Sequence, residues 1–106
     1  MLFEFGSKSS FKNYINKAIR SLQTKDYTTA QEQIKHAMLE NYNAPEVHNL
    51  LGILAELTGD ASMACKHYRA AYALDPTYKP VSRNLERITS MYSRIGNENP
   101  DFGDKP

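Results

Sequence analysis

One stretch of the chain, residues 59–76 with the sequence GDASMACKHYRAAYALDP, constrains the fold more than any other. Asp60 is placed to cap a helix, because its carboxylate can accept a hydrogen bond from a free backbone N–H of the first turn. Apolar residues then recur at helical spacing, at Ala61, Ala64, Tyr68, Ala71 and Tyr72. The small Ala64 and Ala71 allow a second helix to approach closely. Asp75-Pro76 ends the helix, since helical geometry is disfavoured for a residue that precedes proline.

The same pattern recurs with a period of 34 residues, a step that takes Asp26 to Asp60. The step also relates packing positions to one another: Ala30 to Ala64, Ala37 to Ala71, Ile19 to Ile53, Val47 to Val81 and Leu51 to Leu85. A fixed period of this length is typical of stacked helical hairpins. Residues 47–57 are apolar nearly all round, which predicts a helix that is buried on most sides at the centre of the domain.

Residues 45–78 resemble a tetratricopeptide repeat. The resemblance rests on the turn Gly59-Asp60, the small–aromatic–small run Ala64, Tyr68 and Ala71, the exit Leu74-Asp75-Pro76, and Leu51-Gly52 in the first helix. This repeat departs from the family at His48, where an aromatic residue is usual, and at Ala55, where a larger side chain is usual. Residues 11–44 form a weaker copy, with Lys17 in place of leucine and Ser21 in place of an aromatic residue.

The resemblance implies an all-α, right-handed α-α superhelix of two helical hairpins plus a capping helix. The predicted organisation is an N-terminal arm (1–10), a first repeat (11–44), a second repeat (45–78), a capping helix (79–96) and a flexible tail (97–106). The capping helix presents one polar face to water, as terminal repeats do. The arm carries Leu2, Phe3 and Phe5, which either fold back over a helix end or pack on a second subunit.

Composition narrows the classes of partner. The chain has 106 residues and a formal net charge of +1, whereas a duplex-binding protein normally has a strongly basic face. The single Cys65 cannot form an internal disulfide and fits a reducing compartment. No apolar run approaches the length of a membrane span. We therefore expect a cytoplasmic protein with a protein or peptide partner, and neither nucleic acid nor membrane as a ligand.

Residues that carry chemistry are not arranged as a site in this sequence. His36, His48 and His67 have no partner at metal-ligand spacing, and His48 reads as a half-buried packing residue. The glycines are scattered turn residues and form no phosphate-binding loop. We therefore predict no catalytic residue, no metal site and no cofactor, and we expect that the protein is not an enzyme.

The family resemblance points to a binding groove. Stacked hairpins curve into a scoop whose concave side binds ligands, and in the family the first helix of each repeat lines that side. The corresponding positions are Lys12, Ile15, Ile19, Leu22 and Gln23 in the first repeat, Glu46, Asn49, Ile53 and Glu56 in the second, and Arg83, Arg87 and Ser90 in the capping helix. Ile15 and Ile19 would form an apolar floor, unless the arm covers them. Arg83 and Arg87 share a helix face and could hold a carboxylate.

The sequence thus predicts a non-catalytic protein–protein interaction module that binds a peptide in its groove. One family subset grips the C-terminal carboxylate of chaperones, but the matching positions hold Ile15, Ile19, Leu50, Pro80 and Asn84, so that clamp is absent. Two alternatives stay open. The chain could self-associate as a homodimer through its arm and Tyr27, or it could be a regulatory subunit of an enzyme. The partner itself is not identified by the sequence.

Overall fold

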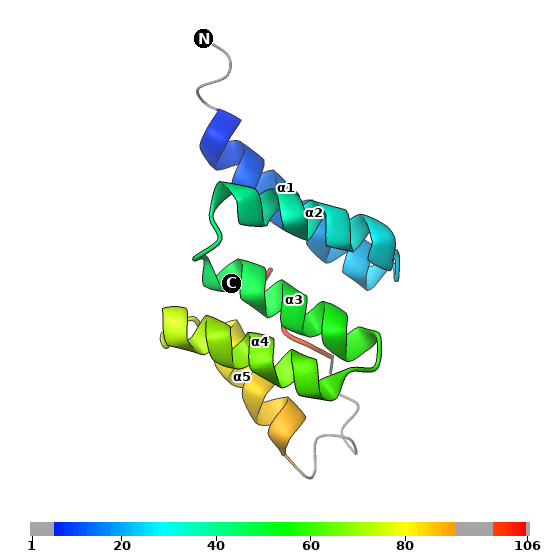
Figure 1. Cartoon of the computed structure of the whole chain (residues 1–106), viewed down its shortest axis with the longest axis vertical. Coiled ribbons are helices and arrows are strands. Elements are labelled where there is room, and N and C mark those ends of the chain that lie inside the picture. The colour runs from blue at the N-terminus through cyan, green and yellow to red at the C-terminus, as the bar shows by residue number, and fades with distance from the viewer. Residues whose placement is uncertain (1–5, 91–98, 106) are drawn as a thin grey trace.

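The computed structural model describes residues 6–90 and 99–105, and within them the chain forms helices and no strand. The helices are α1 (Gly6–Gln23), α2 (Tyr27–Glu40), α3 (Pro45–Leu57), α4 (Ala61–Leu74) and α5 (Lys79–Thr89). The prediction of an all-α protein is confirmed. Figure 1 shows α1 packed beside α2 and α3 beside α4, with α5 next to α4 at the far end. No helix among these residues is both long and apolar enough to cross a membrane.

The two turns that close the hairpins have the same geometry. Asp26 caps α2 by accepting from the Thr29 N–H, and Asp60 caps α4 by accepting from the Met63 N–H. The residue before each cap has a positive φ, 65° at Lys25 and 93° at Gly59. Lys25 therefore adopts a backbone conformation that glycine adopts at no steric cost. Turns that match at a distance of 34 residues give the sequence period a structural counterpart.

Helix α3 is the centre of the molecule, as its composition predicted, and it packs against each of the other four helices. Val47, Leu50 and Ile53 are at most 1% exposed. The close approach of α4 depends on Gly52, because a Cβ built there would lie 2.4 Å from the ring of Tyr68. The core thus uses a glycine on α3 to make room for a fully buried tyrosine on α4.

Two helix boundaries differ from the prediction. Helix α1 begins at Gly6, so residues 6–10, which the sequence predicted as part of an N-terminal arm, belong to a helix. Once a helix is nucleated, each added residue costs little, so the first turn can extend beyond the packed part. Helix α5 ends at Thr89, and Ser90 is extended, with a ψ of 136°. Residues 1–5 and 91–98 lie outside the described part, and with them the contacts proposed for Leu2, Phe3 and Phe5.

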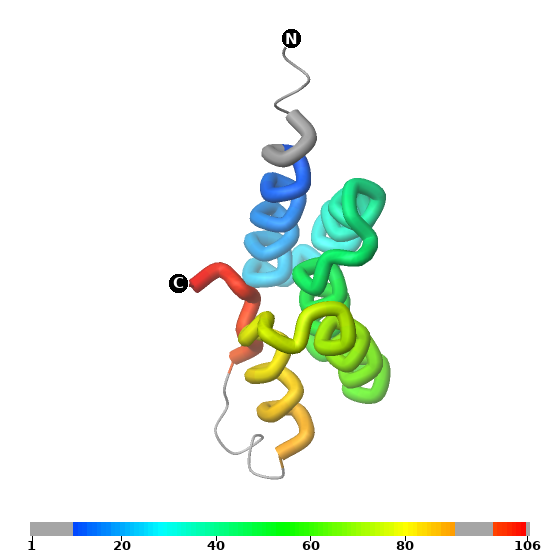
Figure 2. The backbone as a smooth tube through the Cα atoms, turned by 90° about the vertical axis from the view of Figure 1, so that its left-hand side faces the viewer, coloured from blue at the N-terminus to red at the C-terminus, as the bar shows by residue number. Residues whose placement is uncertain are grey.

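The largest difference concerns the residues expected to form a flexible tail. Residues 99–105 lie against the helices, on the side of the molecule where α1, α3 and α5 are found (Figure 2). Helices α2 and α4 are on the opposite side. We call residues 99–105 the 99–105 segment and the surface that it covers the α1–α3–α5 face. The segment docks because buried side chains of α3 and α5 bond to its backbone.

Candidate peptide-binding face

Two buried asparagines hold the backbone of the 99–105 segment. Asn49 on α3 and Asn84 on α5 are 0% and 1% exposed. Both carboxamides donate through Nδ2 to the carbonyl oxygen of Asp101, at 3.0 Å and 2.9 Å. The Asp101 N–H donates in turn to Asn84 Oδ1 at 2.7 Å. Asn84 also donates to Asn49 Oδ1 at 2.8 Å, so the two side chains fix each other.

This arrangement satisfies both backbone groups of one residue. A buried polar group left without a hydrogen bond costs about 1–3 kcal/mol, so Asn49 and Asn84 need a partner on this face. They bond to main-chain atoms of Asp101, which every residue except proline can offer in full. The asparagine pair is therefore a site for an extended backbone, and it does not depend on the side chain at that position.

The Asp101 carboxylate makes a second set of contacts. Its Oδ2 accepts from Arg83 Nη1 at 2.9 Å, and its Oδ1 accepts from the Gly103 N–H at 2.9 Å. Arg83 is exposed, so this ion pair stabilises the docked state by about 1 kcal/mol or less. Three residues after Asp101, Asp104 Oδ2 accepts a long hydrogen bond of 3.4 Å from Gln23 Nε2 at the end of α1. The segment thus reaches residues from α1, α3 and α5.

Gly103 fits a position that an L-residue with a Cβ would not. Its φ is 82°, and a Cβ built there would lie 2.3 Å from Tyr78 Oη. Tyr78 is half-buried, and burial raises its pKa. The charges of Glu46, Asp101 and Asp104 raise the pKa further. A neutral phenol therefore sits beneath the glycine at neutral pH.

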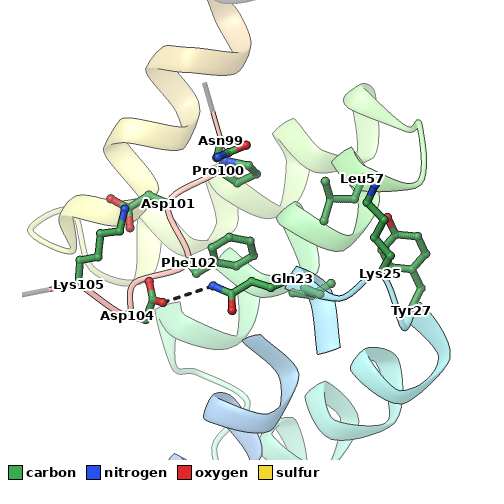
Figure 3. A pocket seen from close by; sticks show the side chains of 11 residues that line it. Gln23, Lys25, Tyr27, Leu57, Asn99, Pro100, Asp101, Phe102, Asp104 and Lys105 are labelled. Carbon is green, nitrogen blue, oxygen red and sulfur yellow. Dashed lines mark hydrogen bonds between the residues drawn. The ribbon is translucent and has the colours of Figure 1, made fainter. Parts of the chain in front are cut away.

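Phe102 packs onto the edge of the hydrophobic core and forms a wall of an open pocket of about 330 Å³. Figure 3 shows Phe102 on one side of this pocket, with Leu57, Lys25 and Tyr27 on the other. Leu22 and Gln23 from the end of α1 also line it. The pocket therefore lies between the aromatic residue of the segment and the turn that joins α1 to α2.

A second polar cluster lies beside the asparagines. Arg87 donates to both carboxylate oxygens of Glu56, with 2.8 Å from Nη2 to Oε1. Tyr68 Oη donates to the same Oε1 at 2.7 Å. The hydrogen bonds with Glu56 raise the pKa of Arg87, and burial raises the pKa of Tyr68. Arg87 Nη2 also lies 3.3 Å from Asn84 Oδ1, so this cluster helps to orient the asparagine.

The structure brings several of the predicted groove positions to this face and removes others. Gln23, Asn49 and Arg83 contact the segment, while Glu56 and Arg87 pair with each other. Lys12 is exposed on α1, Glu46 is half-buried at the start of α3, and Ser90 is half-buried directly after α5.

The predicted apolar floor is wrong. Ile15 and Ile19 are 9% and 5% exposed, and Ile53 is wholly buried. These side chains belong to the core because they fill the space between the stacked hairpins. Leu22 is also buried, although it reaches one wall of the pocket. The surface open to a ligand is therefore more polar than the sequence suggested.

Sequence reasoning missed Asn84, Tyr78 and the 99–105 segment as parts of this site. One signal was available: the 34-residue step takes Leu50 to Asn84, so an amide stands at an apolar packing position. A polar residue at such a position needs a buried hydrogen-bond partner. Nothing in the sequence pattern indicates that residues 99–105 supply that partner.

Comparisons with protein-family models, with curated proteins and with solved structures found no match to this chain.

Proposed function

We propose that this protein is a non-catalytic interaction module of the tetratricopeptide type, a right-handed superhelix of two repeats with a capping helix. Its ligand is an extended peptide that lies along the α1–α3–α5 face. The protein acts in the cytoplasm. Three features support the proposal: the period of 34 residues, the matching turns before α2 and α4, and the position of the first helix of each hairpin on the occupied face.

The observation that carries the proposal is the asparagine pair. Asn49 and Asn84 bond the carbonyl and the N–H of Asp101 from two different helices. Two amides buried at a shared face, with hydrogen bonds directed to a main chain, are suited to an extended peptide of any origin. Main-chain bonds of this kind give affinity, and pockets for side chains give specificity.

The face is occupied by the chain's own 99–105 segment, and this affects how binding must be measured. A tethered segment competes at an effective concentration on the order of millimolar. A free peptide binds the whole chain only in competition with it. Weakening the segment should therefore reveal binding that the unmodified protein conceals.

The test uses the full chain with Asp101→Ala and Phe102→Ala, which weakens the segment by removing its side-chain contacts with Arg83 and with the edge of the core. A library of displayed random peptides is selected against this variant and counter-selected with Arg83→Glu added. We expect enriched peptides that lose at least tenfold in affinity with Arg83→Glu. Arg69→Glu is the matched control, because Arg69 is also an exposed arginine but lies on α4. If no peptide is enriched, or if both charge reversals weaken binding equally, the α1–α3–α5 face is not the binding site.

A further inference from the structure

Residues 101–104 of the 99–105 segment each make a separate contact with the α1–α3–α5 face. The acidic Asp101 meets Arg83, and the aromatic Phe102 packs at the edge of the core beside the open pocket. Gly103 lies on Tyr78, and the acidic Asp104 meets Gln23. Each of these four consecutive residues thus has a different partner on the face. The backbone site alone would accept many peptides, so the four side-chain positions add sequence selection.

Glycine is the most stringent of the four positions, for two reasons. A φ of 82° is unfavourable for an L-residue with a side chain. The Cβ of such a residue would also overlap Tyr78 Oη, and Tyr78 packs against the core. A ligand with any other L-residue at this position must adopt a different backbone conformation and must also displace the Tyr78 side chain.

The position of Asp101 favours an aspartate because of both the length and the charge of its side chain. One carboxylate oxygen accepts from Arg83, and the other accepts from the N–H two residues ahead. An aspartate makes this local hydrogen bond readily, and it pre-forms the turn that leads into the glycine. The acidic residue and the glycine therefore act together in shaping the bound backbone.

We propose that residues 101–104, Asp-Phe-Gly-Asp, are an internal copy of the sequence that the partner presents. The partner is a protein with an exposed extended segment of the form acidic–aromatic–glycine–acidic, and the 99–105 segment holds the face closed until this partner displaces it. This inference rests on the proposed function.

A different protein suits this role better than a second copy of the chain. A second copy would bring only the contacts that the tethered segment already makes, and it would do so at a lower effective concentration. A different protein can make contacts that the segment does not make. The open pocket of about 330 Å³ is lined on one side by the segment itself, Phe102 included, and on the other by Leu22, Tyr27 and Leu57. A partner that places its own aromatic residue at the Phe102 position can add a further apolar side chain against these three residues.

The test measures binding of the acetylated and amidated peptide Asn-Pro-Asp-Phe-Gly-Asp-Lys to the full chain by calorimetry. We expect weak binding to the unmodified protein and at least tenfold tighter binding to Phe102→Ala, whose own segment is weakened. Leu39→Ala is the matched control, since Leu39 is an apolar residue that is 84% exposed on α2. Circular dichroism verifies that each variant keeps its helices, and Gly103→Ala gives a second, independent way of weakening the segment.

Peptide variants test the sequence selection. L-alanine at the glycine position should weaken binding at least tenfold, and D-alanine should weaken it less, because a D-residue accepts a positive φ. A scrambled peptide should not bind. Equal binding of the peptide to the unmodified protein, Phe102→Ala and Gly103→Ala would show that the segment is not a competitor and would overturn the inference.

Two further results separate this inference from the proposed function. If the library selected against the opened variant yields peptides without the acidic–aromatic–glycine pattern, the internal-copy inference is wrong and the peptide-binding function stands. If no peptide binds any variant, both are wrong. A dimer in light scattering that becomes a monomer with Phe102→Ala would assign the segment to a second copy and would also overturn the inference.

Discussion

Arg83 and Arg87 are one helical turn apart on α5, yet they belong to two different polar clusters. The side chain of Arg87 is 10% exposed and pairs with Glu56, which Tyr68 also contacts. The side chain of Arg83 is 62% exposed and pairs with Asp101. We call the first the core cluster and the second the docking cluster. The difference in burial gives the two arginines different roles. Arg87 links α5 to α3 through a largely buried ion pair, whereas Arg83 contacts the 99–105 segment through an exposed ion pair for which water can compete.

Removing each arginine should produce the largest difference between the clusters. Arg87→Met leaves the carboxylate of Glu56 without its cation in a largely buried place, and the expected loss in unfolding free energy is about 3 kcal/mol. Arg83→Met should cost about 1 kcal/mol or less, because the pair is exposed to water. Urea denaturation followed by circular dichroism measures both. Equal losses would mean that the clusters do not differ in kind.

The core cluster also depends on how closely α4 approaches α3. Gly52→Ala introduces a Cβ into space that the Tyr68 ring occupies, so the ring must move away from Glu56. We expect a loss of about 2 kcal/mol from overpacking, measured by urea denaturation. Tyr68→Phe is the control, because it removes the hydrogen bond to Glu56 but keeps the packing, and it should cost about 1 kcal/mol. A harmless Gly52→Ala would show that the contact is loose.

Alkaline solution should weaken both clusters, each through a tyrosine. Burial raises the pKa of Tyr68 in the core cluster and of Tyr78 beside the docking cluster. A tyrosine whose pKa is higher in the folded than in the unfolded state contributes stability at pH values below its ordinary pKa of about 10. This contribution is lost as the pH rises above about 10.

The measurement is the urea midpoint between about pH 8 and about pH 11, with Tyr68→Phe and Tyr78→Phe beside the unmodified chain. We expect Tyr68→Phe to reduce the alkaline loss of global stability. Tyr78→Phe should mainly protect the docking of the 99–105 segment, followed by the NMR signal of the Gly103 amide. Identical alkaline profiles in all three proteins would exclude these tyrosines as the groups that titrate.

The smallest effect is expected from the docking cluster itself. Asp101→Asn weakens the contact with the exposed Arg83 but leaves the backbone hydrogen bonds to Asn49 and Asn84 possible. Global stability should change by about 0.5 kcal/mol or less, while hydrogen exchange at the Gly103 amide should become faster. High salt should have the same effect on the unmodified chain and little on the variant. A large loss of global stability would place the segment in the folding core.

Much of the fold followed from local pattern. Asp26 and Asp60 cap their helices where the sequence placed them, and α3 is central because it is apolar on most sides. Glu56 and Arg87 match groove positions of the resembled family, but the sequence pattern does not show that they pair with each other. The boundary at Gly6 was missed because no residue there signals a helix start.

The sequence by itself therefore determined the helices, the turns and the packing positions, since these depend on residues within a few turns of one another. The tertiary structure alone decided which polar groups meet. Gln23 and Asp104 are 81 residues apart in sequence, Asn49 and Asp101 are 52 apart, and Asn84 and Asp101 are 17 apart. No periodicity encodes such contacts. They arise because α1, α3 and α5 share one face, and because two buried amides on that face require a partner that residues 99–105 provide.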